Sequence, residues 1–136
     1  MTHLLDTNTC VGLLRSPGNR QIRKRLAAMD PADVALCSVV RAELVYGAYR
    51  SRAPAKTLAQ LATFFTQFVS LPFDDGAADV YGQVRSALAA AGTPIGPNDL
   101  MIAAIALANG LVLVTHNTAE FGRVPGLQTE DWELVP

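Results

Sequence analysis

The sequence predicts an α/β fold in which helices cover both faces of a small parallel sheet. Short apolar runs of strand length alternate along the chain with longer segments of helical periodicity. The apolar runs are continuous, which is typical of strands buried on both faces of a parallel sheet. Half of the 136 residues are apolar, so a packed core is expected, and residues 1–136 are predicted to form a single domain.

Four strands are predicted with a fifth at the edge of the sheet, each a short apolar run bounded by turn residues. The first ends on an acid, Asp6. The fourth is the clearest, because it is continuous and rich in β-branched residues. In chain order the strands are residues 3–6, 34–37, 71–73, 111–114 and 127–129.

Six helices are predicted between these strands, and polar residues mark where they begin. Residues 7–9 offer an N-cap for the first helix, Ser38 for the third and Asn98 for the sixth. Residues 74–75 place negative charge at the positive end of the fifth, and Gly110 ends the sixth. In chain order the helices are residues 10–14, 19–29, 38–50, 55–69, 74–91 and 99–109.

The composition excludes several classes of protein. A chain with 50% apolar residues is not intrinsically disordered, and two cysteines are too few for a disulfide scaffold. The chain does not open with a basic segment followed by a long apolar run, and its longest apolar stretch is too short to cross a bilayer. We therefore expect a cytoplasmic protein without a membrane partner, in which Cys10 and Cys37 are reduced core thiols.

The charges are unevenly distributed, although the net charge is only −1. Residues 15–56 carry nine of the eleven basic side chains and three acids, whereas residues 57–136 carry two basic side chains and eight acids. A basic region of this kind can hold a phosphate backbone even in a nearly neutral chain. The alternative is that these side chains form the solvated faces of helices, and the charge pattern alone leaves both interpretations open.

Three acidic residues stand at positions where an acid is unexpected. Asp6 follows the first strand at its carboxyl end, where parallel sheets collect ligand-binding groups. Glu43 shares the apolar face of its helix with Val39 and Val40, and Asp99 opens the most apolar helix. Each also has a structural interpretation: a helix cap for Asp6, an exposed position on a tilted helix for Glu43, and a helix-dipole role for Asp99.

Carboxylates that converge in one cleft repel each other, and a divalent cation removes that repulsion. Mg²⁺ or Mn²⁺ fits such a site, because both prefer oxygen ligands and retain water molecules. Zinc is not expected, since the chain has two histidines and no Cys-x-x-Cys. After the fourth strand, Asn117 and Glu120 either complete the metal site or form a helix-capping box.

Four short motifs occur in a fixed order, LLDTN, RAELVYG, GPNDLMIAA and THNTAEF, at residues 4–8, 41–47, 96–104 and 115–121. In order, spacing and total length they resemble the PIN-domain ribonucleases, and among them the VapC-type toxins of bacterial toxin–antitoxin pairs. One such motif carries little information, but four in register are specific. The resemblance covers essentially the whole chain.

The resemblance implies an α/β/α sandwich around a parallel sheet of four or five strands, and a Mg²⁺- or Mn²⁺-dependent endoribonuclease. Asp6, Glu43 and Asp99 match the carboxylates of the family. Many PIN domains carry an Asp where this chain has Asn117, and Glu120 is expected to substitute for it. Asp6 and Asp99 would hold the cation and Glu43 would be a ligand or the base that orients the attacking water, so products would carry 5′-phosphate and 3′-hydroxyl ends.

The resemblance also implies a substrate and partners. Family members cut structured RNA such as tRNA or a ribosomal RNA loop, and those with the most similar motifs cut initiator tRNA in its anticodon stem-loop, which blocks translation. A cognate VapB-like antitoxin is expected to occupy the cleft, with DNA contacted only through that antitoxin, and homodimers are usual. The residues expected to hold the RNA backbone are basic: Arg15, Arg20, Arg23, Lys24, Arg25, Arg50 and Arg52.

Three other classes of protein share parts of this pattern. A haloacid-dehalogenase-type phosphatase needs a second Asp where this chain has Asn8, and a late lysine, which the chain does not have. A receiver-type signalling module needs an acidic pair after the first strand, and residues 74–75 do not satisfy that pattern. The serious alternative is a degenerate PIN module that binds RNA or protein without cleaving it, and Asn117 is the only residue that favours it.

Overall fold

The sheet at the centre of the molecule has five strands, all parallel, in the order β3-β2-β1-β4-β5. The structure is a computed structural model that describes residues 1–135. It confirms the predicted fold class, including the fifth strand at the edge. The strands are β1 (His3–Leu5), β2 (Val34–Cys37), β3 (Val69–Leu71), β4 (Val112–Val114) and β5 (Thr129–Glu130).

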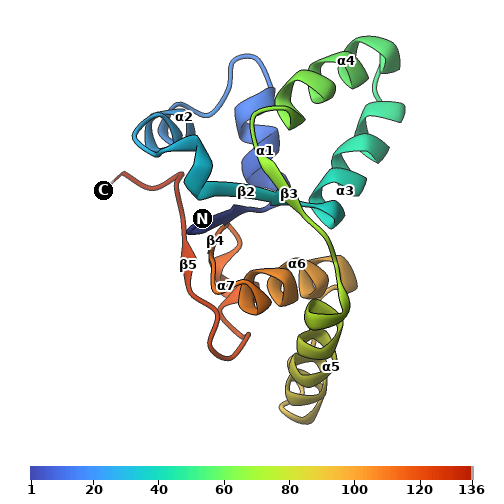
Figure 1. The fold of residues 1–136 in the computed structure, drawn as a ribbon, viewed down its shortest axis with the longest axis vertical. Coiled ribbons are helices and arrows are strands. Elements are labelled where there is room, and N and C mark those ends of the chain that lie inside the picture. The colour runs from blue at the N-terminus through green and yellow to red at the C-terminus, as the bar shows by residue number, and fades with distance from the viewer. Residues whose placement is uncertain (136) are drawn as a thin grey trace.

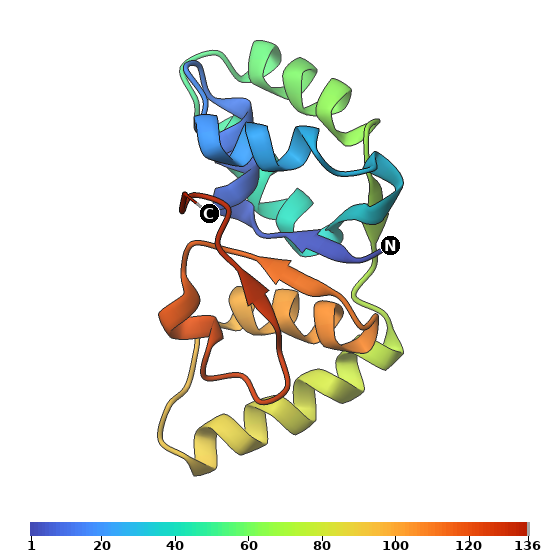
Figure 2. The same cartoon turned by 90° about the vertical axis from the view of Figure 1, so that its left-hand side faces the viewer.

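Helices cover both faces of this sheet and make three layers (Figures 1 and 2). Four helices lie on one face: α1 (Thr7–Leu14), α2 (Arg20–Ala27), α3 (Ser38–Tyr49) and α4 (Pro54–Phe65). On the opposite face α6 (Pro97–Ala108) lies next to the sheet, and α5 (Asp75–Ala90) packs along its outer side. The one-turn helix α7 (Thr118–Phe121) follows β4.

The core lies between the sheet and these helices, as the continuous apolar runs predict. All four residues of β2 are buried, and Leu4 and Leu5 of β1 are fully inaccessible to solvent. Residues 102–106 of α6 are also fully buried, which explains why that helix is apolar on every side. Burial of this kind contributes on the order of 25 cal/mol per Å² of apolar surface, so β1, β2 and α6 form the most strongly held part of the fold.

The parallel arrangement brings the carboxyl ends of β1 and β4 together at one edge of the sheet. Leu5 pairs with Val114, and the amide of the next residue, Asp6, donates to the carbonyl of Val114 at 3.0 Å. The chain leaves β1 into α1 and leaves β4 toward α7 at this edge (Figure 2). Side chains that follow these two strands therefore lie close together.

Several predicted boundaries were wrong, mostly at helix starts. Asp6, rather than residues 7–9, caps α1. Asn98 does not cap α6, because Pro97 occupies the first helical position and Gly96 precedes it; the fixed φ of proline suits that position without a capping side chain. Ser38 is the first residue of α3 rather than its cap, and its hydroxyl accepts from the amide of Phe73 instead.

Two strands are also shifted from their predicted positions. The third covers Val69–Leu71 rather than residues 71–73, because α4 ends at Phe65, earlier than its apolar periodicity indicates. The last strand covers Thr129–Glu130, where it pairs with β4, instead of residues 127–129. In both cases the limits of the strand are set by its pairing with the neighbouring strand. The periodicity of a single sequence carries no information about that pairing.

The segment after β5 packs against the rest of the fold through Trp132, whose side chain is 2% exposed. Its indole Nε1 donates to Glu130 Oε1 at 3.0 Å, and the same oxygen lies 3.1 Å from His3 Nε2. The indole ring also contacts the His3 ring and the Arg25 guanidinium. The first strand, the second helix and the last segment are thus joined through one aromatic side chain.

None of the helices within residues 1–135 has the length and apolar composition needed to cross a bilayer. Cys10 and Cys37 are both buried and both free, as expected for reduced core thiols.

Candidate active site

Asp6 stands at the carboxyl end of β1, where it caps the helix that follows. Its Oδ1 accepts from the amide of Thr9 at 2.8 Å and so caps α1, which confirms the structural interpretation of this residue. Its side chain is only 5% exposed. A buried carboxylate that uses one oxygen for a cap can offer its other oxygen to a ligand, so the cap does not remove Asp6 from the candidate site.

Glu43 projects from α3 toward the start of α1. Its Oε1 accepts from the hydroxyl of Thr7 at 2.6 Å, a short bond of the kind expected between a hydroxyl and a carboxylate. Glu43 is half-buried, while Val39 and Val40 on the same face are buried. The fold therefore holds Glu43 beside the junction of β1 and α1. Its partner there, Thr7, is the residue that follows Asp6 in the chain. Sequence reasoning missed Thr7, because a threonine after a strand has many ordinary uses.

Asp99 lies in the first turn of α6 and faces the same space. Burial, followed by the negative charges of Glu120, Glu43 and Asp6 in that order, raises the pKa of its carboxyl from 3.8 to about 6. These contributions require all four acids to lie within electrostatic reach of each other. The structure thus brings together the three acids that the sequence singled out, and adds Glu120.

Glu120 is held by two donors, one on each carboxylate oxygen. The amide of Gly96 donates to Oε1 at 3.0 Å, and Nδ2 of Asn117 donates to Oε2 at 2.9 Å. These two hydrogen bonds lower the pKa of Glu120. Asn117 makes no side-chain cap to α7, so the two residues do not form the capping box that their spacing imitates. Instead, Asn117 orients Glu120 toward Asp99.

The donor set fits a hard divalent cation. Asp6, Glu43, Asp99 and Glu120 supply only carboxylate oxygens, the ligands that Mg²⁺ and Mn²⁺ prefer. Among these groups, Asp99 is held with a raised pKa and Glu120 with a lowered one. Pairs of carboxylates whose pKa values are pushed apart are typical of catalytic sites, and a cation would remove the repulsion that raises the pKa of Asp99.

The raised pKa of Asp99 predicts how the stability of the metal-free protein depends on pH. The folded state binds this proton more tightly than the unfolded state, so stability falls as the pH rises from about 4 to about 6 and is level above that range. Asn mimics the protonated carboxyl, so Asp99→Asn should be as stable as the wild type near pH 4. Near pH 7.5 it should be more stable by about 1–2 kcal/mol, a figure discounted for the solvent exposure of this half-buried group.

Urea unfolding in EDTA at four pH values between 4 and 8 measures this difference. Asp75→Asn is the matched control, because Asp75 is also in the first turn of a helix but is exposed at the far end of α5. If the two variants follow the same pH profile, the acids around Asp99 do not repel one another as the structure indicates.

Four of the predicted RNA-binding residues lie on α2, and the other three lie in the segments that follow α1 and α3. Arg15 lines a groove of about 330 Å³ together with Thr7 and Glu43. Arg23 and Arg25 already use their guanidinium groups within the fold: Arg23 Nη2 donates to the carbonyls of Leu13 and Arg15, and Arg25 contacts Glu130 and Trp132. The remaining four are exposed: Arg20, Lys24, Arg50 and Arg52.

Sequence reasoning also missed a second polar cluster next to Asn117. His116 Nδ1 lies 2.9 Å from Asp131 Oδ2 and 3.2 Å from Glu133 Oε2, and the three ligand atoms lie close enough together to hold a metal ion. The hydrogen bond to Asp131, followed by the charges of Glu133 and Asp131, raises the pKa of His116. These residues lie side by side only because β4 pairs with β5. Their separation in the sequence gives no indication that they form a cluster.

The comparison with protein families identifies the fold that carries this site. The PIN domain model matches residues 3–127, which is nearly the whole chain. The chain belongs to the PIN-domain family. Within that family it is of the VapC type, because it is 42% identical over 129 residues to the tRNA(fMet)-specific endonuclease VapC of Salmonella typhimurium, an alignment that covers 95% of this chain and 96% of that protein.

Other VapC proteins and solved structures are similar to this chain over nearly its full length. Ribonuclease VapC2 of Rickettsia felis is 35% identical over 98% of this chain and 99% of its own. Among solved structures, a DNA-bound VapBC complex from Salmonella typhimurium contains a chain that superposes with a TM-score of 0.91, is 41% identical, and covers 97% of this chain and 98% of that one. The VapC identification predicted from the four motifs is therefore confirmed over the full length of the PIN domain.

Proposed function

We propose that this VapC-type protein is a metal-dependent endoribonuclease and the toxin of a toxin–antitoxin pair. The observation that carries the proposal is the proximity of Glu120, Glu43 and Asp6 to Asp99, whose pKa is raised first by burial and then by these three negative charges. A protein that only binds RNA gains nothing from four mutually repelling acids. The relatives named as ribonucleases, at 42% and 35% identity, support the same conclusion.

We propose Mg²⁺ or Mn²⁺ as the cation, held by Asp6 and Asp99. When bound, it would lower the pKa of a coordinated water and neutralise charge that develops on the phosphate. Glu43, positioned by the hydroxyl of Thr7, would act as a further ligand or as the base that orients the attacking water. Hydrolysis of this kind leaves a 5′-phosphate and a 3′-hydroxyl, and does not use the 2′-hydroxyl as a nucleophile.

Glu120 takes the part that an aspartate at position 117 plays in many PIN domains. Asn117 cannot be a carboxylate ligand, but its amide holds one oxygen of Glu120 while the amide of Gly96 holds the other. We propose that Asn117 is a positioning residue and that Glu120 completes the acidic site. This arrangement supports a catalytic domain over the degenerate binding module that Asn117 alone would favour.

We further propose tRNA as the substrate, and initiator tRNA as the first to test, because the relatives at 42% and 41% identity are named as tRNA(fMet)-specific endonucleases. The partner would be a VapB-like antitoxin, since similar chains occur in VapBC complexes. The groove between α1, α3 and α4 leads past apolar side chains to Glu43, and a peptide with a basic side chain would fit there. On this proposal DNA is contacted through the antitoxin, and the protein acts as a homodimer in the cytoplasm.

A cleavage assay tests the proposal. Antitoxin-free protein is incubated with initiator tRNA, with elongator methionine tRNA and with total tRNA, in Mg²⁺, in Mn²⁺ or in EDTA. We expect one discrete cut in the anticodon stem-loop of initiator tRNA, abolished by EDTA and leaving a 5′-phosphate. A cut in every tRNA would contradict the specificity, a cut in EDTA would contradict the metal, and RNA binding without any cut would favour the degenerate module.

A further inference from the structure

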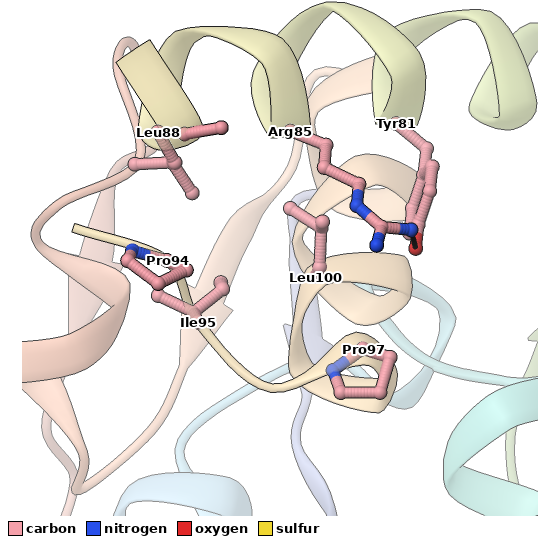
Figure 3. Close-up of a pocket in the computed structure, with 8 residues that line it drawn as sticks. Tyr81, Arg85, Leu88, Pro94, Ile95, Pro97 and Leu100 are labelled. Atoms are coloured by element: carbon pink, nitrogen blue, oxygen red, sulfur yellow. Dashed lines mark hydrogen bonds between the residues drawn. The ribbon is translucent and has the colours of Figure 1, made fainter. Parts of the chain in front are cut away.

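A pocket of about 270 Å³ lies between α5, α6 and the loop that joins them (Figure 3). Tyr81 and Arg85 reach into it from α5, and Leu100 forms its back wall on α6. The rings of Pro94 and Pro97 and the side chain of Ile95 border it on the loop side. The pocket is distinct from the groove that contains Thr7 and Glu43.

The chemistry of this pocket differs from that of the surrounding chain. Residues 57–136 contain eight acids and two bases, yet every residue that lines the pocket, in the part of the chain that the structure describes, is apolar, aromatic or basic. Both bases stand beside it: Arg85 lines it, and Arg123 donates to the carbonyl of Pro94 at 3.2 Å. Within residues 1–135 Arg85 forms no ion pair, so its charge is available to an anion.

Arg85 and Tyr81 are arranged as a unit. Arg85 Nη1 donates to the hydroxyl of Tyr81 at 3.0 Å, and the guanidinium lies 5.8 Å from the centre of the Tyr81 ring. The ring of Phe73 meets the Tyr81 ring edge-on at 5.9 Å and fixes its orientation. An oriented aromatic ring next to a guanidinium fork is a combination that single-stranded RNA binders use, the ring for a base and the fork for a phosphate.

The loop that borders the pocket also builds the acidic site. Pro94, Ile95 and Pro97 face the pocket, while the intervening Gly96 donates its amide to Glu120, and Asp99 follows two residues after Pro97. A strand of RNA whose phosphate lies at the carboxylates would therefore pass over this loop to reach the pocket. The acids at the site repel a phosphate backbone, and the two arginines beside the loop offset that repulsion.

We propose that this pocket binds a nucleotide of the RNA substrate next to the bond that is cut. The base lies against Tyr81 and the proline rings, and the Arg85 guanidinium binds the phosphate. The inference rests on the proposed ribonuclease function and adds a binding site in the acidic half of the chain, outside the basic region of residues 15–56 that the charge pattern singled out.

Binding of fluorescein-labelled initiator tRNA, measured by anisotropy in EDTA so that no cleavage occurs, tests this site. Arg85→Gln should weaken binding about tenfold and reduce the slope of log K against log salt concentration by about one, the change expected for the loss of one phosphate contact. Gln83→Glu is the matched control: it makes the same charge change, by one unit, at an exposed position of α5 that does not line the pocket, and it should bind within twofold of wild type.

A second measurement does not depend on a charge change. Initiator tRNA that carries 4-thiouridine in the anticodon loop should crosslink to the peptide that contains Tyr81, and Tyr81→Leu, which keeps the apolar packing of this half-buried position, should weaken binding about tenfold. Circular dichroism confirms that each variant is folded before binding is compared.

The outcomes separate this site from the proposed function. If wild type cuts tRNA while Arg85→Gln and Tyr81→Leu bind it normally without a crosslink at Tyr81, the pocket is not a nucleotide site and the ribonuclease proposal stands. If the two variants bind RNA normally but lose dimerisation or antitoxin binding, the pocket is a protein interface and the inference is wrong. If wild type neither binds nor cuts any RNA, both proposals fail together.

Discussion

Asp99→Asn should lower the rate of RNA cleavage about a hundredfold to a thousandfold and leave the protein folded. The substitution removes one of the two carboxylates proposed to hold the cation, and losses of 10²–10³ are typical when a single group that stabilises developing charge is removed. Its fold should survive, because Asp99 is half-buried, does not cap its helix and is repelled by its neighbours. The measurement is single-turnover cleavage of initiator tRNA at saturating Mn²⁺.

Asp75→Asn again serves as the control, and it should cleave at the wild-type rate. A second readout separates lost chemistry from lost binding: tRNA affinity in EDTA should not fall for Asp99→Asn, since removing a negative charge next to the phosphate reduces repulsion. If Asp99→Asn cleaves within tenfold of wild type, the cation is not held as we propose, and Asp6 with Glu43 and Glu120 would have to suffice.

Trp132→Ala should lower the free energy of unfolding by about 3–4 kcal/mol, the usual range for truncation of a buried aromatic side chain. The indole is 2% exposed and packs against the His3 ring with centroids 5.8 Å apart. Its loss would also leave Glu130 without the indole donor. Urea unfolding followed by circular dichroism is the measurement, since the substitution removes the only tryptophan of the chain.

Leu134→Ala is the comparison for this prediction, because Leu134 lies two residues further along and is 60% exposed. Surface substitutions of this kind change stability by about 0.5 kcal/mol or less. A loss below about 1 kcal/mol for Trp132→Ala would mean that the last segment does not contribute to the core as the structure shows.

The number of strands, their order along the chain and the helical layers were predictable, and the three principal acids could be singled out, because each of these depends on local information. A continuous apolar run indicates a strand buried on both faces, and an acid after such a strand or on an apolar helix face is conspicuous. Helix starts were less predictable: Asn98 is a good capping residue for a helix that begins at Asp99, but the helix begins two residues earlier, at Pro97. The capping preference of one residue is a weak guide to a helix start where the neighbouring residue also favours the start of a helix.

The contacts that orient the site could not be predicted, because they join residues far apart in the chain. Thr7 is 36 residues from Glu43, and Gly96 is 24 residues from Glu120. The spacing of Asn117 and Glu120 suggested a capping box, and only the position of Gly96 shows that Glu120 turns away from its own helix. The Tyr81–Arg85 pair could not be predicted for a different reason. A charge pattern reports local excess charge, and one arginine in an acidic region does not produce a basic excess.

The strand order has a consequence for how the protein is made. The central strand β1 is synthesised first, but one of its two neighbours, β4, comes more than a hundred residues later. Until the ribosome has released that part of the chain, the nascent protein has β1 with one edge unpaired, and Asp6 and Glu43 without Asp99 and Glu120. Contacts of such long sequence separation make folding slow. Newly made chains therefore pass through a period in which that edge is aggregation-prone and the group of acids is incomplete.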